Sequence, residues 1–341
     1  MKPKHLITYA FFCLVIPLAL FAQGQGQNPT TNSNYRLSGP YTHKNLTVFL
    51  IHGKDQTTKP FLTLQEALAQ KKVKVYETKD VNELAIRNLS NEDIYVQAGD
   101  IVRGGEQDRM ISVDFIVPPK SGRMPIAAFC VESGRWNKRG NEEAAEFSSS
   151  DNAVATKDLK LAAKSANSQQ AVWQNVTVAQ EKLSQNVNAT VSSPVSRSSL
   201  ELSIENSKVQ EASADYINEL AGILKNKSDV IGYVFAINGK VNSADVYASH
   251  GLFAKLWPKL LKSSAVEAIA ESGKAPVKPA PVASETVESF LAESEKPAAA
   301  AKEVTTRVRM VTREDDKNVF FETQDREQKD GWVHRNYIRK Q

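Results

Sequence analysis

The chain has 341 residues, of which 41% are hydrophobic and 24% are charged, and its formal net charge is +4. Without residues 1–22 it keeps 41 basic and 39 acidic residues and is nearly neutral. A nucleic-acid-binding protein typically carries a basic stripe with interleaved aromatic side chains, and this balance gives no reason to expect one. The length allows one large domain or two small ones.

The first 22 residues have the pattern of a signal peptide. Lys2 and Lys4 precede an apolar run over residues 6–21, and Ala22 supplies the small residue expected before a cleavage site. We therefore expect export, to the periplasm or beyond the cell, and no membrane span in the mature chain. An uncleaved anchor would need close to 20 apolar residues. Cys130 is then the one cysteine left, so an intramolecular disulfide is excluded.

The first half of the mature chain is predicted to be mostly sheet. Residues 23–43 are interpreted as a flexible leader, because a polar stretch without apolar periodicity does not pack. Thr63, with Glu66 three residues later, predicts a helix over residues 63–70. Short apolar runs predict strands at residues 46–51, 73–76, 84–89, 94–96, 111–117 and 126–131.

The middle of the chain is predicted to be helical. The Ala/Ser/Asn-rich segment 142–206 is expected to be partly loose, with a helix near residues 170–185. Helical spacing returns at residues 212–224. A helix is expected over residues 252–270, with Pro258 breaking or bending it near its start.

The last third is predicted to contain a hairpin and a meander. Asn238-Gly239 joins two apolar runs and is a strong hairpin signal. A proline-rich connector at residues 274–282 precedes a short helix at 286–291. Strands at 304–312, 319–323 and 332–338 complete an α+β domain that spans residues 44–341.

The first candidate site is the segment 99–109, where glycines and charged residues lie between two apolar runs. If residues 94–102 form one strand, Asp100 and Arg103 point to opposite faces. The guanidinium of arginine can form two parallel hydrogen bonds to a carboxylate or phosphate group, so the arginines here could bind an anionic ligand. The charged residues of this segment can equally form structural ion pairs around a tight turn. Both interpretations stay open for the candidate ligand-binding residues Asp100, Arg103, Gly104, Gly105, Glu106 and Arg109, and for Asp108 as a catalytic candidate.

The second candidate site is the segment 129–136. Alternation on a strand places the Cys130 thiol and the Glu132 carboxylate on one face. Cys130 as a nucleophile needs a base, which His250 or His334 could supply in the fold; otherwise it is a small buried hydrophobe. Glu132 could act as a general base while Arg135 holds an anion and Trp136 stacks on a ring, or Glu132 could pair with Arg135.

Motifs that would name a reaction are absent. The chain has no nucleophile elbow, Walker-type loop, dinucleotide fingerprint or zinc-ligand spacing. Outside the signal peptide, the histidines His43, His52, His250 and His334 are scattered, so no metal site is predicted, and the cofactor stays unknown.

Several segments together resemble one known family, the ARG (ADP-ribosylglycohydrolase) and rhodanese-phosphatase-superfamily-associated protein domain. The resemblance is strongest over residues 45–136 and continues more weakly through 170–173 and 237–261. It implies no established activity, and a link to ADP-ribose or nucleotide metabolism is an analogy. The segments that carry it are residues 45–49, 62–68, 81–84, 99–109, 117–119, 129–132 and 134–136.

Two functional hypotheses follow. The first is an exported binding or interaction module whose loops hold an anionic small molecule, a glycan or a protein. The second is a hydrolase on an ADP-ribose-like, nucleotide or glycosidic substrate. In the hydrolase, Glu132, or less favourably Asp100 or Asp108, would be the general acid/base, and an arginine would clamp the charge.

Overall fold

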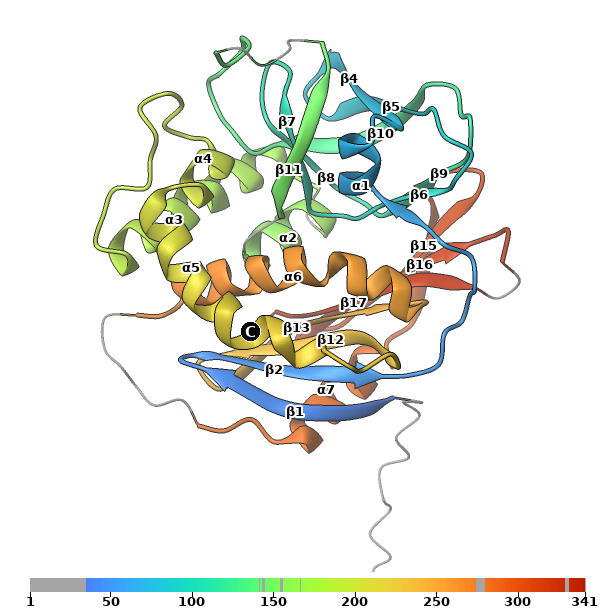
Figure 1. Cartoon of the computed structure of the whole chain (residues 1–341), viewed down its shortest axis with the longest axis vertical. Coiled ribbons are helices and arrows are strands. Elements are labelled where there is room, and N and C mark those ends of the chain that lie inside the picture. The colour runs from blue at the N-terminus through green and yellow to red at the C-terminus, as the bar shows by residue number, and fades with distance from the viewer. Residues whose placement is uncertain are drawn as a thin grey trace, which may run out of the picture. The chain divides into compact units, whose positions relative to one another are not determined.

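The computed structural model describes residues 35–340 apart from 141, 143–144, 154–155, 166, 274–279 and 329–330. The expected signal peptide, residues 23–34 of the expected leader and most of the proline-rich connector therefore lie outside the described residues. Within the described part, strands in three sheets and seven α-helices confirm the α+β class. The sheets and helices are arranged as Figure 1 shows.

The largest sheet joins the beginning of the described chain to its end. All of its neighbouring strands are antiparallel. Its strands, in spatial order, are β1 (Arg36–His43), β2 (Leu46–His52), β12 (Val230–Ile237), β13 (Lys240–Tyr247), β17 (Trp332–Arg339), β16 (Asn318–Asp325), β15 (Val308–Glu314) and β14 (Ala299–Glu303). The assignment of residues 36–43 to a flexible leader is wrong, because β1 pairs with β2 along its length.

The predicted hairpin and C-terminal meander are confirmed. Asn238 and Gly239 have φ angles of 53° and 78°, as a two-residue turn between antiparallel strands requires. A Cβ at Gly239 would lie 2.8 Å from the Ala280 carbonyl oxygen, so glycine is also needed there for a close approach. In the turn before β16, the Asp315 carboxylate accepts hydrogen bonds from the backbone N–H groups of Lys317 and Asn318.

Two smaller sheets form the other β layer. Residues 94–102 are not one strand, and residues 111–117 are divided too, because the chain crosses from one small sheet to the other at both places. The six-stranded sheet has the order β11 (Phe147–Ala153), β7 (Asp100–Gly104), β8 (Arg109–Ile111), β10 (Met124–Cys130), β5 (Glu83–Asn88) and β4 (Val73–Asp80). The three-stranded sheet contains β3 (Leu62–Thr63), β6 (Ile94–Val96) and β9 (Phe115–Val117).

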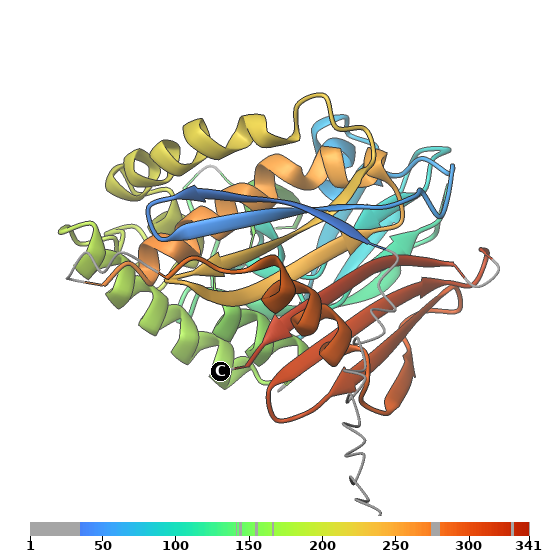
Figure 2. The ribbon, with the colours of Figure 1, turned by 90° about the horizontal axis from the view of Figure 1, so that it is seen from below.

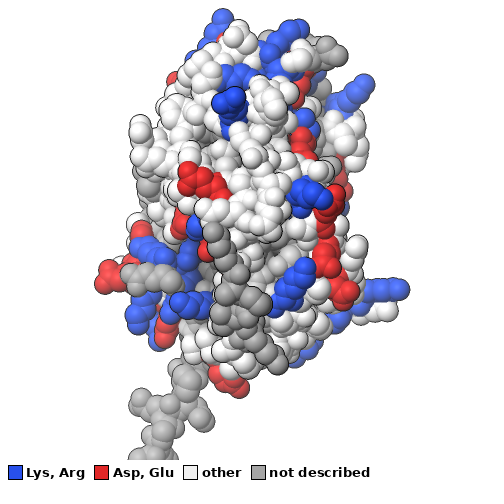
Figure 3. Space-filling view, turned by 90° about the vertical axis from the view of Figure 1, so that its left-hand side faces the viewer, with Lys and Arg blue, Asp and Glu red and all other residues white. Residues whose placement is uncertain are grey.

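Much of the segment 142–206, part of which is expected to be loose, has regular structure within the described residues. It contains β11 and three helices, α2 (Lys157–Lys164), α3 (Gln169–Asn186) and α4 (Leu200–Ile204). Each helix begins at a serine or threonine whose side chain accepts a backbone N–H, which is the usual N-cap arrangement. The side on which α3 and α4 lie in Figure 1 is mostly uncharged (Figure 3).

The remaining helices match the predictions closely, with one exception. Thr63 and Glu66 form the predicted capping box at α1 (Leu64–Ala69). Pro258 does not interrupt its helix, which runs from His250 to Ala270. These remaining elements are α5 (Ser207–Leu220), the 3-10 helix η1 (Ala221–Leu224), α6 (His250–Ala270) and α7 (Ser284–Ser294). No helix in the described part of the chain is long and apolar enough to span a membrane.

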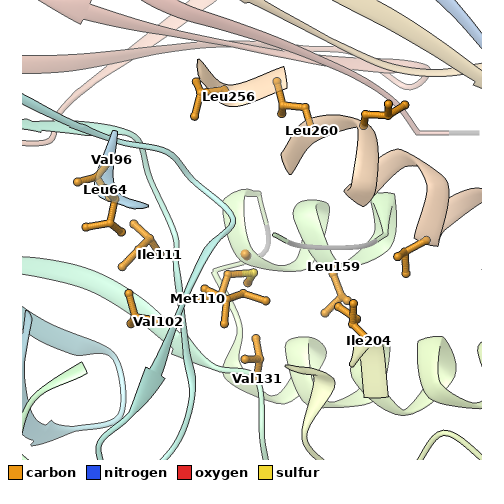
Figure 4. Close-up of a cluster of buried hydrophobic side chains, with 14 of the residues drawn as sticks. Leu64, Val96, Val102, Met110, Ile111, Val131, Leu159, Ile204, Leu256 and Leu260 are labelled. Carbon is orange, nitrogen blue, oxygen red and sulfur yellow. The ribbon is translucent and has the colours of Figure 1, made fainter. Parts of the chain in front are cut away.

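The large sheet is covered on both faces. Val48 and Leu50 of β2 belong to the main core with α6, whereas Phe49 and Ile51 belong to a second core with α7. Figure 2 shows α7 lying against the sheet on its outer side. On the inner side, α6 lies between the large sheet and the smaller sheets, and side chains from α1, α2, α4, α6 and the small sheets meet there (Figure 4).

A buried arginine ties the large sheet to the three-stranded sheet. Arg307 precedes β15, and its guanidinium donates to both oxygens of Asp325 at 2.7 Å. It also donates to both oxygens of Asp93, which precedes β6, at 2.7 and 3.0 Å. Two bidentate contacts on one guanidinium fix both the separation and the orientation of the two sheets at this point.

Arg307→Met is expected to lower the free energy of unfolding by about 3–5 kcal/mol, because it leaves two buried carboxylates without their shared partner. Urea denaturation of the full chain measures the change. The control Arg309→Met removes a half-exposed arginine from β15 and is expected to change stability by about 0.5 kcal/mol or less. Equal destabilisation by both variants would contradict the linking role of Arg307.

Candidate functional site

The segment 99–109 forms a β-hairpin inside the six-stranded sheet, between β11 and β10. Val102 of β7 pairs with Arg109 of β8, so the expected chain reversal is confirmed. Gly104 and Gly105 have φ angles of 122° and 56°. A Cβ at Gly105 would lie 2.4 Å from the Phe147 ring, so the turn needs glycine for both its conformation and its close approach.

Asp108 lies at the centre of a buried group of charges. Its carboxylate accepts hydrogen bonds from Arg139 at 3.0 Å and Arg135 at 3.4 Å. It also accepts from the backbone N–H of Gly104 at 3.2 Å and from the Ser199 hydroxyl at 3.4 Å. Burial raises the pKa of Asp108, and the Arg139 charge opposes that rise without cancelling it.

Glu132 contacts the same group. Its Oε2 lies 2.8 Å from Arg135 Nη2 and accepts the backbone N–H of Asp108 at 3.2 Å. Burial by itself would raise the pKa of Glu132, but hydrogen bonds from Arg135 and Ser196 outweigh it and lower the pKa. Glu132 is therefore a buried carboxylate that holds its negative charge through its neighbours.

The other arginines also have carboxylate partners. Arg103 pairs with Glu205 at 2.7 Å and with Glu142 at 3.6 Å. Arg109 pairs with Glu77 at 3.3 Å. We call the whole group the arginine–carboxylate cluster; its members are Arg103, Arg109, Arg135 and Arg139 with Glu77, Asp108, Glu132, Glu142 and Glu205.

Asp100 and Trp136 lie apart from this cluster, and Glu106 contacts it through its backbone. Asp100 contacts Lys259 of α6 at 2.8 Å. Glu106 is half-buried, and its backbone N–H donates to Glu77 at 3.2 Å. Trp136 is 49% exposed. The structure thus brings Arg103, Asp108, Glu132 and Arg135 together. Asp100 and Trp136 lie apart from these four charged residues.

Cys130 lacks the surroundings of a nucleophile. Its thiol contacts the Arg109 guanidinium and the Val81 carbonyl oxygen, the latter at 3.6 Å. Burial raises the pKa of Cys130 to about 11, so the thiol is protonated at neutral pH. The predicted approach of His250 or His334 is not observed: His250 bonds to the Val230 carbonyl and His334 to two aspartates.

Sequence reasoning missed Arg139, Glu142 and Glu201, which lie in loops and helices without a motif. Glu201 of α4 is fully buried and accepts hydrogen bonds from Ser150 at 2.6 Å and Asn152 at 3.1 Å. Burial, reinforced by the charges of Glu205 and Asp108, raises its pKa to about 7. An alternating strand pattern marks Cys130 and Glu132, but no local pattern marks residues that meet only in the fold.

Several buried polar atoms around the cluster make no hydrogen bond within the described residues. Such atoms are uncommon in folded proteins, where a buried polar group normally finds a partner. This region therefore has both hydrogen-bond donors and hydrogen-bond acceptors that are unused. The atoms are Gln107 Nε2, Arg109 Nε, Glu132 Oε1, Arg135 Nε, Glu142 Oε2 and Glu201 Oε2.

A second buried polar group surrounds His334 of β17. Its ring nitrogens lie 2.8 Å from Asp114 and 3.1 Å from Asp245, and its ring stacks on Tyr247 at 4.5 Å. Burial would lower the pKa of His334, but the two carboxylates outweigh it and raise the pKa. The adjacent cavity measures about 30 Å³, the space of one water molecule. Within the residues described, no three His, Cys, Asp or Glu side chains are placed to hold a metal ion.

Glu201→Gln is expected to change how stability depends on pH. The folded pKa of about 7 lies above the ordinary value of 4.5, so the wild-type chain is most stable below pH 4.5 with respect to this group and loses that stability as the pH rises to about 7. The wild type should therefore lose roughly 3 kcal/mol relative to the variant over this interval. Urea midpoints measured from pH 4.5 to 8 test this, and a constant difference would refute it.

A known family covers both candidate segments of this chain. Residues 34–338 match the family of the ARG and Rhodanese-Phosphatase-superfamily-associated Protein domain, which confirms the resemblance. Neither a curated protein nor a solved structure matches the chain. The match covers nearly all of the described residues, including both candidate segments. The chain therefore belongs to the ARG and Rhodanese-Phosphatase-superfamily-associated Protein domain family, which is functionally uncharacterised.

Proposed function

We propose that the protein is an exported binding module that presents Trp136 to a neutral glycan. The observation that carries this proposal is a half-exposed tryptophan on a loop whose neighbouring arginine is anchored in the protein interior. Tryptophan offers a large apolar face and few rotatable bonds, which is why it dominates many binding surfaces. Export rests on the signal-peptide pattern of residues 1–22.

The loop that carries Trp136 is preorganised. Arg135 Nη1 donates to the Asn137 carbonyl at 2.7 Å and to the Gly105 carbonyl at 3.3 Å, while Nη2 contacts Glu132 and Asp108. The Ser133 backbone N–H donates to the Ser198 hydroxyl at 3.0 Å. A loop held in this way loses little conformational entropy when it binds a ligand.

The surroundings of Trp136 favour an uncharged partner. Trp136, Val178 and Val195 are the large hydrophobic residues exposed in the described part of the chain. The contact between Ser133 and Ser198 joins the Trp136 loop to the loop before α4. Gln180 of α3 donates a hydrogen bond to the Arg197 carbonyl at 2.9 Å and so joins α3 to the same loop. The side of the molecule on which α3 lies is mostly uncharged (Figure 3).

The glycan is preferred over the other two predicted partner classes. Guanidinium forks are well suited to an anionic small molecule, but those of Arg103, Arg109 and Arg135 already pair with carboxylates. The core of a protein interface is enriched in aromatic residues, and among the exposed large hydrophobic residues of the described part Trp136 is the one aromatic. Residues 166–206 instead supply many hydroxyl and amide side chains, with Glu181, Lys182, Arg197, Glu201 and Glu205 as their charged residues.

Trp136→Ala is expected to weaken glycan binding at least tenfold, because it removes the aromatic face that packs against a sugar ring. The full chain is tested on an array of neutral oligosaccharides, followed by titration calorimetry with the best ligand. The melting temperature should stay nearly unchanged, since the side chain is half exposed.

Trp136→Phe is the matched control, because it keeps an aromatic ring at this position and should retain part of the affinity. Absence of binding to every neutral glycan, or equal affinity of wild type and Trp136→Ala, would sink the proposal. Selective binding of ADP-ribose or another anion would favour an anionic-ligand site instead.

A hydrolase is the second candidate, and one observation favours it. The pKa of Glu201 is raised to about 7 whereas that of Glu132 is lowered, and both carboxylates interact with the charge or backbone of Asp108. Carboxyl groups whose pKa values are pushed apart suit a division into general acid and general base. The substrate would be ADP-ribose-like, a nucleotide or a glycoside.

Under this alternative, Glu132→Gln and Glu201→Gln should each lower kcat by a factor of about 10² or more. Turnover is assayed with ADP-ribosylated peptide, nucleotides and aryl glycosides. Glu219→Gln, an exposed position on α5, is the control and should leave turnover unchanged. Turnover that survives both Glu132→Gln and Glu201→Gln, or no turnover in the wild type, would exclude these residues as the acid and base.

A further inference from the structure

A separate cavity lies between the start of α2, the end of α6 and the β12–β13 turn. Its volume is about 320 Å³, within the size range of small-molecule sites. None of the candidate residues of segments 99–109 and 129–136 lines it. Its walls combine buried acceptors, lysines and two apolar side chains, Ile237 and Val241.

The inner wall of the cavity carries two acceptor atoms without a donor. Glu267 of α6 and Asn242 of β13 are only 2% and 8% exposed. Glu267 Oε1 accepts the Lys157 backbone N–H at 2.6 Å and the Asn242 Nδ2 at 3.0 Å. Glu267 Oε2 and Asn242 Oδ1 have no partner among the described residues. A buried carboxylate oxygen without a donor is costly, so this wall suits a ligand that donates hydrogen bonds.

Apart from Glu267, the lining carries a net charge of +1, because Lys157, Lys182 and Lys240 stand against Asp158 and Glu271. Lys240 is exposed and Lys157 is half-buried, and neither ammonium forms an ion pair within the part of the chain that is described. Lys182 is already paired with Glu271 at 2.6 Å. The cavity is therefore negative at its inner wall and positive on its lysine side, and Lys182 contributes little to that polarity.

We propose that this cavity binds a free α-amino acid with an apolar side chain, in its zwitterionic form. The ammonium donates to Glu267 Oε2 and Asn242 Oδ1, and the carboxylate faces the ammonium groups of Lys157 and Lys240. The side chain of the ligand packs against Ile237 and Val241.

The charge pattern selects a zwitterion over simpler ions. A cation without a carboxylate would contact Glu267 but meet unpaired lysine charge, and an anion without an amine would meet the unpartnered Glu267 oxygen. The lining contains three lysines and three acidic residues, namely Lys157, Lys182 and Lys240 with Asp158, Glu267 and Glu271. A ligand with one charge of each sign preserves this balance.

The test is titration calorimetry of the full chain with L-leucine, compared with isoamylamine and 4-methylpentanoate, which carry one charge each. Leucine should bind at least tenfold more tightly than either analogue. Glu267→Gln should weaken leucine binding at least tenfold, and Lys240→Gln should weaken it several-fold. Lys240 is exposed, so its variant keeps the test valid if Glu267→Gln fails to fold.

Glu293→Gln, an exposed position on α7 outside the cavity, is the matched control and should bind leucine as the wild type does. Three results would overturn the proposal: no leucine binding at 10 mM, an analogue that binds as tightly as leucine, or unchanged affinity in Lys240→Gln and in any Glu267→Gln protein that folds. Because Trp136 lies outside this cavity, loss of glycan binding in Trp136→Ala leaves this test unaffected.

Discussion

The central strands of the eight-stranded sheet bury side chains on both faces, and the rest of the fold depends on covering both. Every residue of β2 is buried, and its successive side chains enter two different cores. Because successive side chains of a strand point to opposite faces, β2 can be fully buried only if other elements pack on both faces of the sheet. The sheet receives α7 on one face and α6 on the other. Fifteen of the 21 residues of α6 are buried, because the helix is itself covered by the smaller sheets.

The arginine–carboxylate cluster lies in the layer beyond α6 and joins distant parts of the chain. Asp108 from the β7–β8 hairpin, Arg135 and Arg139 from the loop after β10, and Ser199 before α4 meet at one carboxylate. Buried ion pairs contribute little net stability compared with apolar packing, since desolvation offsets their attraction, but removing one partner is costly. Such a cluster therefore serves mainly to hold loops in one arrangement. This is the physical basis on which Trp136 is presented to solvent.

The cluster also changes what the charged residues can do. Segment 99–109 has the residues of an anion clamp, yet its guanidiniums bind carboxylates of the same chain. Glu132 and Arg135, three residues apart, satisfy each other. Asp108, Glu132 and the arginines of both segments therefore form the structural ion pairs that were the alternative to a ligand site. A ligand would have to bind the polar atoms that remain without a partner, or the exposed Trp136. Candidate residues chosen by type alone do not reveal this, because one carboxylate nearby is enough to neutralise an arginine.

Local sequence patterns determined much of the secondary structure. The Asn238-Gly239 turn, the Thr63–Glu66 capping box and the C-terminal meander were predictable because each depends on neighbours a few residues away. The pattern failed at β1, whose partner strand supplies the reason to be extended, and at residues 94–102, where the chain changes sheets. The helix continued through Pro258 because the packing of its fifteen buried residues outweighs one missing hydrogen bond.

The sequence by itself therefore determined the class of the fold, the family resemblance and which loops concentrate charge, glycine and tryptophan. Only the tertiary structure decided which charges meet. Arg139 and Glu201 became neighbours of Asp108, His334 joined Asp114 and Asp245, and Cys130 came to rest beside Arg109. The physical reason is that hydrogen bonding and pKa depend on distance and burial, and residues 21 to 220 positions apart in the chain acquire both only when the sheets and helices pack.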